Sequence, residues 1–175
     1  SVSLGWAFSE EQFVEFLKPV LSFGKLRLSY GSSGNDVGLG DYDYVSTASL
    51  GTAGFGTIPA NQVSSGFGGL ISYDRTWEKV SQKNFGIDLN FFDNRLKATF
   101  DYFIKDNTGM LVNVTYPGVL GGKAPKTNSG HLNVKGWEFT IGWRDQIKDF
   151  SYYANFNIGD TKSLLKEMKG ADSYG

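Results

Sequence analysis

Long stretches of the sequence alternate between apolar and polar residues, and this period of two restricts them to β-strands with unlike faces. The segment from Gln82 to Phe91 is the clearest case, with apolar odd positions from Phe85 onward and mostly Asn, Asp or Gln at even positions. The same alternation recurs in three further long segments, residues 96–105, 137–144 and 150–158, and in two shorter ones, residues 2–8 and 26–30. We therefore predict six strands.

The four longer segments have the purity that lipid contact would require. From Phe85 onward in the first of them, the apolar faces carry no charged side chain and no Asn, Gln, Ser or Thr, and a charge at the bilayer midplane costs about 2–4 kcal/mol. They also run to about ten residues, whereas strands of soluble sheets have about five or six. Aromatic residues gather near the predicted short connections, as in an interfacial girdle: Trp6, Phe8, Phe91, Phe92, Trp143 and Phe150. This pattern predicts an all-β fold, an antiparallel up-and-down transmembrane β-barrel segment.

The alternation assigns the side chains to two predicted faces. The lipid-facing residues are expected to be Phe85, Ile87, Leu89, Phe100, Tyr102, Trp137, Phe139, Ile141, Trp143 and Phe156. The lumen-facing residues are expected to be Asn84, Asp88, Asn90, Lys97, Asp101 and Lys105. Because the second set mixes opposite charges, we expect it to pair across neighbouring strands.

Short and long connections alternate along the chain. Short turns are predicted at Phe92–Asn94 and around Arg144–Asp149, and one short connector helix, with Ser9 as its N-cap, is predicted before residue 26. Long loops are predicted at Gly31–Thr76 and Gly109–Leu132. Aromatic and charged residues of the first loop and its end could stack on sugar rings or bind hydroxyls, which makes substrate-facing candidates of Tyr42, Tyr44, Tyr73, Asp74, Arg75 and Trp77.

Six strands are too few to close a transmembrane barrel, because bacterial barrels begin at about eight. An isolated six-stranded sheet would also present unpaired backbone groups to lipid. We therefore expect residues 1–175 to be one partial barrel domain, with the remaining strands outside it.

Composition argues against several other classes of function. The net charge is −1 and no run of Lys and Arg is present, so we expect no nucleic-acid partner. The chain has no cysteine, its single histidine, His131, has no evident catalytic partners, and its Asp residues lack the spacing of a calcium loop. We expect no enzymatic activity, no metal and no cofactor.

Several motifs together resemble the SusC/RagA family of TonB-dependent transporters, in the C-terminal part of its barrel. They begin with Ser1-Val2-Ser3-Leu4-Gly5-Trp6 and Lys25-Leu26-Arg27-Leu28-Ser29-Tyr30-Gly31. They continue with Gly34-Asn35-Asp36, Thr76-Trp77-Glu78-Lys79, Asn84-Phe85-Gly86-Ile87-Asp88, Asp101-Tyr102-Phe103, Met110-Leu111, Asn128-Ser129-Gly130 and Gly136-Trp137-Glu138. The likeness runs through nearly the whole chain in order.

This resemblance implies a multi-pass protein of the bacterial outer membrane in Bacteroidota, with a barrel of about 22 strands around a plug. It implies uptake of oligosaccharides or peptides with a SusD-like surface lipoprotein, driven by TonB through the plug. The lumen-facing residues would then also contact the plug. The plug and its TonB-contacting segment are absent from these residues, so energised transport belongs to the larger protein.

Two alternatives remain open on the sequence. A soluble all-β carbohydrate-binding module would fold without detergent and bind glycans. A small self-assembling outer-membrane barrel or adhesin would associate in detergent from several copies of a complete 175-residue chain.

Overall fold

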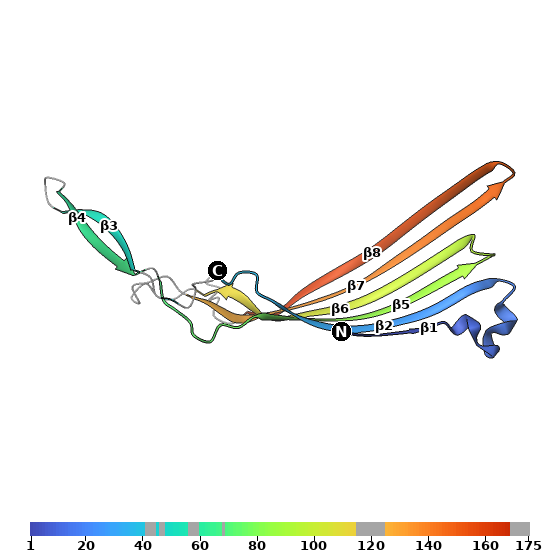
Figure 1. Cartoon of the computed structure of the whole chain (residues 1–175), viewed down its shortest axis with the longest axis horizontal. Coiled ribbons are helices and arrows are strands. Elements are labelled where there is room, and N and C mark those ends of the chain that lie inside the picture. Colours follow the sequence, from blue (N-terminus) through green and yellow to red (C-terminus); the bar gives the residue numbers. More distant parts are fainter. Residues whose placement is uncertain (41–44, 46–47, 56–59, 68, 115–124, 169–175) are drawn as a thin grey trace. The chain divides into compact units, whose positions relative to one another are not determined.

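A computed structural model describes residues 1–40, 45, 48–55, 60–67, 69–114 and 125–168. Six strands form one sheet in the order β1-β2-β5-β6-β7-β8, as Figure 1 shows. They are β1 (Val2–Trp6), β2 (Leu21–Asn35), β5 (Glu78–Phe91), β6 (Leu96–Asn113), β7 (Lys126–Ile147) and β8 (Phe150–Met168). The all-β, antiparallel, up-and-down architecture predicted from the alternation is thereby confirmed.

The chain divides into two compact units. Unit 1 contains residues 1–33, 79–107 and 132–165, and unit 2 contains residues 34–78, 108–131 and 166–175. Unit 1 holds the short connections, together with the strand segments that alternate most clearly. Unit 2 holds the long loops and the strand segments that lead into them.

The register of the first two strands follows the alternation. Val2 pairs with Tyr30, Leu4 with Leu28 and Trp6 with Leu26 in an antiparallel ladder. Directly opposed residues of such a ladder lie on the same face of the sheet, so these apolar side chains form one continuous surface.

Both predicted turns are present. The β5–β6 turn has three consecutive residues with positive φ, namely Phe92 at 53°, Asp93 at 55° and Asn94 at 68°. The turn is closed by the Arg95 amide, which donates to the Phe92 carbonyl at 3.1 Å. Asp and Asn tolerate the left-handed region better than other side chains. The β7–β8 turn uses Lys148 in the same region, with φ at 56°.

The connector after β1 is helical, as predicted, but its details differ. It consists of two short 3-10 helices, η1 (Phe8–Glu10) and η2 (Gln12–Leu17). The prediction of Ser9 as N-cap is wrong: Ser9 lies inside η1, and neither helix has a side-chain cap. Its hydroxyl is buried and has no hydrogen-bond partner among the described residues.

The loop predicted at Gly31–Thr76 contains secondary structure that the sequence did not indicate. Strands β3 (Ala48–Phe55) and β4 (Ala60–Phe67) pair as an antiparallel hairpin that forms a separate two-stranded sheet. Strands β6 and β7 also extend into the second predicted loop, to Asn113 and from Lys126. Both predicted loops are therefore partly strand.

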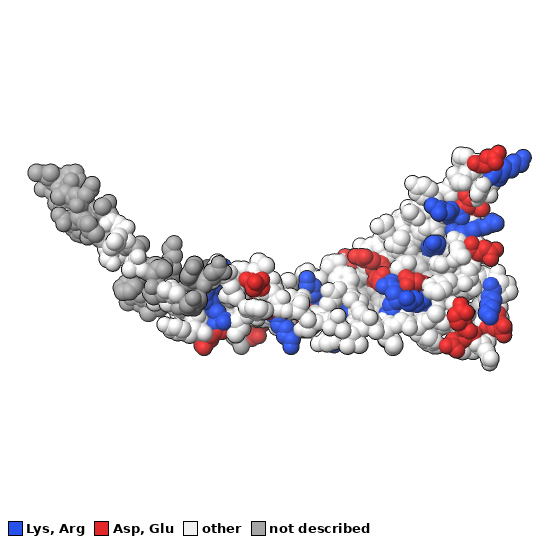
Figure 2. All heavy atoms as spheres, in the orientation of Figure 1, with Lys and Arg blue, Asp and Glu red and all other residues white. Residues whose placement is uncertain are grey.

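The described residues form almost no core of their own. Their buried hydrophobic side chains are Val14, Leu21 and Val114, whereas many large apolar residues are exposed. Charged side chains are concentrated in one region of unit 1. Figure 2 shows basic and acidic side chains crowded at the end of unit 1 that carries the short turns. Among the described residues, no helix is long and apolar enough to cross a membrane.

Candidate functional site

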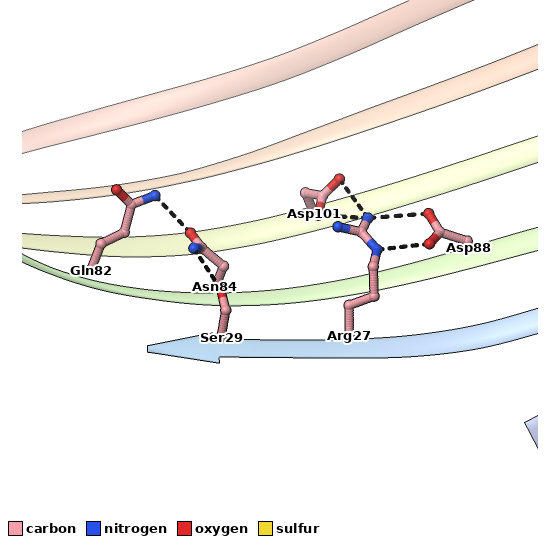
Figure 3. A network of polar contacts seen from close by, with 6 residues as sticks. All are labelled: Arg27, Ser29, Gln82, Asn84, Asp88 and Asp101. Atoms are coloured by element: carbon pink, nitrogen blue, oxygen red, sulfur yellow. Dashed lines mark hydrogen bonds and ion pairs between the residues drawn. The ribbon is translucent and has the colours of Figure 1, made fainter. Parts of the chain in front are cut away.

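The polar face of unit 1 is organised around one arginine (Figure 3). Arg27 on β2 donates from Nε and Nη2 to the two carboxylate oxygens of Asp88 on β5, at 2.7 and 3.1 Å. Its Nη2 also donates to both oxygens of Asp101 on β6, at 3.0 and 3.2 Å. Charge-assisted, bidentate contacts of this kind are stronger than neutral hydrogen bonds. A single side chain thus ties three strands together, in a cluster with formal charge −1.

A glycine makes this contact possible. Gly86 lies on β5 between the strands that carry Arg27 and Asp101. A Cβ built there would lie 2.6 Å from Asp101 Oδ1 and 2.8 Å from both Cζ and Nη2 of Arg27. These distances are shorter than van der Waals contact. The missing side chain at residue 86 therefore provides the space in which the guanidinium crosses β5.

A second, neutral network lies on the same face. Gln82 Nε2 donates to Asn84 Oδ1 at 2.8 Å, and Asn84 Nδ2 donates to the Ser29 hydroxyl at 2.9 Å (Figure 3). Asn90 instead donates to Asn94 in the β5–β6 turn, at 2.8 Å.

The remaining residues predicted to face the lumen are not drawn into these networks. Lys97 lines a shallow groove with Thr99 and Thr140, and Lys105 is exposed. Neither lysine forms a hydrogen bond or ion pair within the described part of the chain. Of the predicted polar set, the structure thus brings Asp88 and Asp101 together, through an arginine that the prediction omitted.

The opposite face carries the apolar residues predicted to face lipid. Phe100 on β6 stacks on Trp137 of β7, with ring centroids 6.5 Å apart and planes inclined by 24°. Near the short turns, Phe92 lies 6.4 Å from Trp143 and Trp6 lies 6.2 Å from Phe8. Regular alternation along β5, β6, β7 and β8 places the other predicted members, Phe85, Ile87, Leu89, Tyr102, Phe139, Ile141 and Phe156, on this face.

In unit 2 a buried carboxylate joins strand ends on either side of β5. Glu78 is 7% exposed. Its Oε2 accepts a hydrogen bond from Asn35 Nδ2 at 3.1 Å, and its Oε1 accepts one from the Leu111 amide at 2.9 Å. Glu78 therefore connects the ends of β2, β5 and β6 where the long loops begin.

A single asparagine fixes the segment just before β5. Asn128 Oδ1 accepts from the Thr76 amide at 2.8 Å, and its Nδ2 donates to the carbonyls of Thr76 and Gly109, both at 2.7 Å. The amide of Asn128 thus pairs with Thr76 as a neighbouring strand would. Next to it, a Cβ at Gly34 would meet the ring of Trp77 at 2.9 Å.

We call the contacts made by Glu78 and Asn128 the loop base. Four of the residues predicted to face substrate lie in the segment just before β5, beside this loop base. Tyr73 and Trp77 are 85% and 68% exposed, Asp74 is exposed, and Arg75 Nε donates to the Ser72 carbonyl at 3.5 Å. Tyr42 and Tyr44 lie outside the described residues. The structure therefore places four of the six candidates in one short segment, two of them as exposed aromatic side chains. Within the described residues, no cluster of three or more His, Cys, Asp or Glu side chains could hold a metal ion.

Sequence reasoning missed the residues that hold both regions together: Arg27, Gly86, Glu78 and Asn128. A signal was present for Arg27, because it is a basic residue on a face that also carries two Asp residues on other strands. The partners are 61 and 74 residues away in sequence, so only the strand register reveals the pairing. Glu78 and Asn128 lie in motifs that carry the family resemblance, and the sequence pattern assigns them no contact.

Glu78 gives a test of the loop base. We expect Glu78→Gln to destabilise the folded protein by about 1 kcal/mol, because the amide group keeps the shape but offers only one acceptor oxygen to two donors. Urea unfolding in lipid vesicles measures the change, and limited proteolysis should show faster cleavage within residues 109–132. Asp74→Asn, the same change of an acid to its amide at an exposed residue, is the control. Equal unfolding midpoints for Glu78→Gln and wild type would contradict the role of Glu78.

Comparison with known protein families places the chain among outer-membrane receptors. A family model described as the TonB dependent receptor-like β-barrel matches residues 1–173. TonB-dependent receptor P39 of Formosa agariphila is 29% identical over 180 residues, covering 99% of this chain and 16% of that receptor. TonB-dependent receptor P26 of the same organism is 28% identical, covering 98% and 17%.

Solved structures of outer-membrane transporters also match this chain. The RagAB peptide transporter superposes with a TM-score of 0.78 at 26% identity, covering 97% of this chain and 18% of that chain. The RagAB peptide importer in its 'open-open' state has a TM-score of 0.77 at 26% identity, covering 95% and 18%. The present chain thus spans between 16% and 18% of the length of these relatives.

Proposed function

Because the chain belongs to the TonB dependent receptor-like β-barrel family, we propose that it supplies wall, lumen lining and outer loops to a larger nutrient importer. The chain is a multi-pass part of the bacterial outer membrane, which it crosses with strands. In this proposal the plug and the remaining strands belong to the same larger protein. The role is transport, as in the TonB-dependent receptors of this family, rather than catalysis.

The observation that carries this proposal is the pair of unlike faces on one sheet. Arg27, Asp88 and Asp101 form an ionic cluster on one face, and Phe100 stacks on Trp137 on the other. An ionic cluster facing hydrocarbon is costly, whereas a water-filled or plugged lumen tolerates it. The polar face therefore lines the lumen and contacts neighbouring strands and the plug, while the apolar face contacts lipid.

The proposed cargo is a peptide or an oligosaccharide, captured together with a SusD-like surface lipoprotein and imported by TonB-driven opening of the plug. The likeness to the RagAB peptide transporter supports a peptide more than a glycan. Tyr73 and Trp77 are the exposed aromatic side chains of the loop base that we propose for ligand contact. Family membership favours this importer over a soluble carbohydrate-binding module and over a small self-assembling barrel.

Uptake by intact cells tests the proposal. We expect deletion of the gene that encodes this segment to abolish import of a labelled peptide mixture, and the wild-type gene to restore it. A copy without the TonB-contacting segment should not restore import. Loss of oligosaccharide import alone would replace the peptide assignment by a glycan. Unchanged import of both classes of cargo would contradict an importer of either kind.

A further inference from the structure

The apolar face of unit 1 is hollowed beside the first two strands. A groove of about 500 Å³ lies across β1, β2, β5 and β6, and its lining includes Leu4, Leu28, Phe85 and Ile104. This volume is within the range of small-molecule sites. The groove is open and almost wholly apolar, and it lies on the face that contacts lipid. Hydrocarbon is the material available to fill it.

A basic side chain stands at one end of this groove. Lys83 is two positions before Phe85 on β5, so both lie on the same face, and both line the groove. The Lys83 side chain is exposed and forms no hydrogen bond or ion pair within the described part of the chain. Its charge is therefore available to a ligand.

The level of Lys83 in the membrane follows from strand geometry. Lys83 precedes Phe91, beside the short β5–β6 turn, by eight residues. With a rise of about 3.3 Å per residue and a tilt of about 40°, it lies about 20 Å from the level of Phe91 along the membrane normal. The apolar band of such barrels is about 25 Å tall, and their short turns face the periplasm. Lys83 thus lies near the outer interface.

Neighbouring strands mark the same boundary. On β6 the apolar row ends at Asp106, and on β7 it ends at Lys135, with Asn133 next on the same face. Asn133 Nδ2 donates to Asp106 Oδ1 at 2.7 Å. Lys135 lies on the same face of β7 as Trp137, but it does not line the groove. Lys83 is therefore distinguished from Lys135 by the apolar groove next to it.

We propose that this groove binds an acyl chain of a phosphate-bearing lipid of the outer leaflet, with Lys83 paired to the lipid phosphate. The groove supplies a fixed apolar surface, and Lys83 supplies the complementary charge at the height of the headgroups. Tyr30 and Tyr102, which also line the groove, present apolar rings with polar hydroxyls suited to this level. The site depends on the membrane location alone and is independent of the imported cargo.

Native mass spectrometry of the intact protein containing this segment tests the proposal. The protein is exchanged into nanodiscs of phosphatidylcholine containing either monophosphoryl lipid A or a neutral glycolipid, and released in mild detergent. We expect retention of monophosphoryl lipid A, and about fivefold weaker retention in Lys83→Gln, since one lysine near a membrane surface contributes roughly that factor. Lys83→Arg should restore retention, and Lys135→Gln should have no effect.

The neutral glycolipid separates the site from ordinary lipid contact. We expect its retention to be low and equal in wild type and Lys83→Gln. Filling the groove with Leu28→Trp should lower retention of monophosphoryl lipid A while Lys83 is intact. Equal retention of the two lipids by wild type, or equal loss in Lys83→Gln and Lys135→Gln, would overturn the proposal and leave only non-specific annular lipid.

Discussion

Phe100→Arg is expected to remove most of the protein from the outer membrane, whereas Thr99→Arg leaves assembly nearly intact. Phe100 and Thr99 are adjacent on β6 and therefore point to opposite faces. An arginine facing lipid near the midplane costs about 2–4 kcal/mol. Phe100→Arg also removes the ring that stacks on Trp137. An arginine at residue 99 would instead face the polar side of the sheet, where Lys97 already lies.

The amount of folded protein in isolated outer membranes, detected by its heat-modifiable electrophoretic mobility, measures this difference. Phe100→Leu is the matched control, because it removes the aromatic contact without adding a charge. We expect Phe100→Leu to assemble at close to the wild-type level. If Phe100→Arg and Thr99→Arg reduced assembly equally, the assignment of the two faces would be wrong.

Gly86→Ala is expected to destabilise the protein by about 2–3 kcal/mol, which is a large effect for one methyl group. The added Cβ would overlap the Arg27 guanidinium and Asp101, so the guanidinium must leave and its charged hydrogen bonds are lost. Glycine in a strand is otherwise unfavourable, and an alanine without steric conflict would stabilise by about 0.5–1 kcal/mol. A loss of stability in Gly86→Ala, rather than a gain, is therefore the result expected if Arg27 crosses β5 at this glycine.

Urea unfolding in lipid vesicles measures this change, with Gly31→Ala as the control. Gly31 lies on the neighbouring strand β2, and the nearest atom to a Cβ there is 3.5 Å away, an ordinary contact. In the background of Arg27→Ala, Gly86→Ala should become neutral or stabilising, because the guanidinium is gone and the Asp101 carboxylate, no longer held by it, can rotate away from the new Cβ. Such coupling is what a double-mutant cycle detects. Additive effects of Arg27→Ala and Gly86→Ala would show that Arg27 does not cross at residue 86.

The strands of the sheet could be predicted because their alternation is strong and local. In segments such as residues 82–91 and 96–105, successive residues alternate between the polar and the apolar face. The residues between these segments, Phe92–Asn94, include Asp and Asn, which favour a turn. The β3–β4 hairpin was missed because Ala48–Phe55 and Ala60–Phe67 are rich in small residues and do not alternate. Their strand character lies in pairing with each other, which the period-two rule does not detect.

The candidate site could be predicted only in part. Its polar residues were found from the alternation, but the central Arg27 cluster depends on register between strands far apart in sequence. The role of Gly86 depends on the Arg27 and Asp101 side chains that pass close to its Cα. These neighbours are known only once β2, β5 and β6 are placed side by side. Asn128 and Glu78 act through backbone groups of Thr76 and Leu111, and a sequence pattern does not show such contacts.

Spin-label accessibility along β6 tests the central claim most directly. The 175 residues contain no cysteine, so single cysteines can be placed from residue 97 to residue 104 and labelled in lipid vesicles, in the larger protein with any cysteine outside this segment replaced by serine. We expect a period of two. Labels at the even positions should be accessible to dissolved oxygen and shielded from a water-soluble nickel complex, and labels at the odd positions should show the reverse. Uniform accessibility along β6 would contradict a wall that separates lipid from lumen.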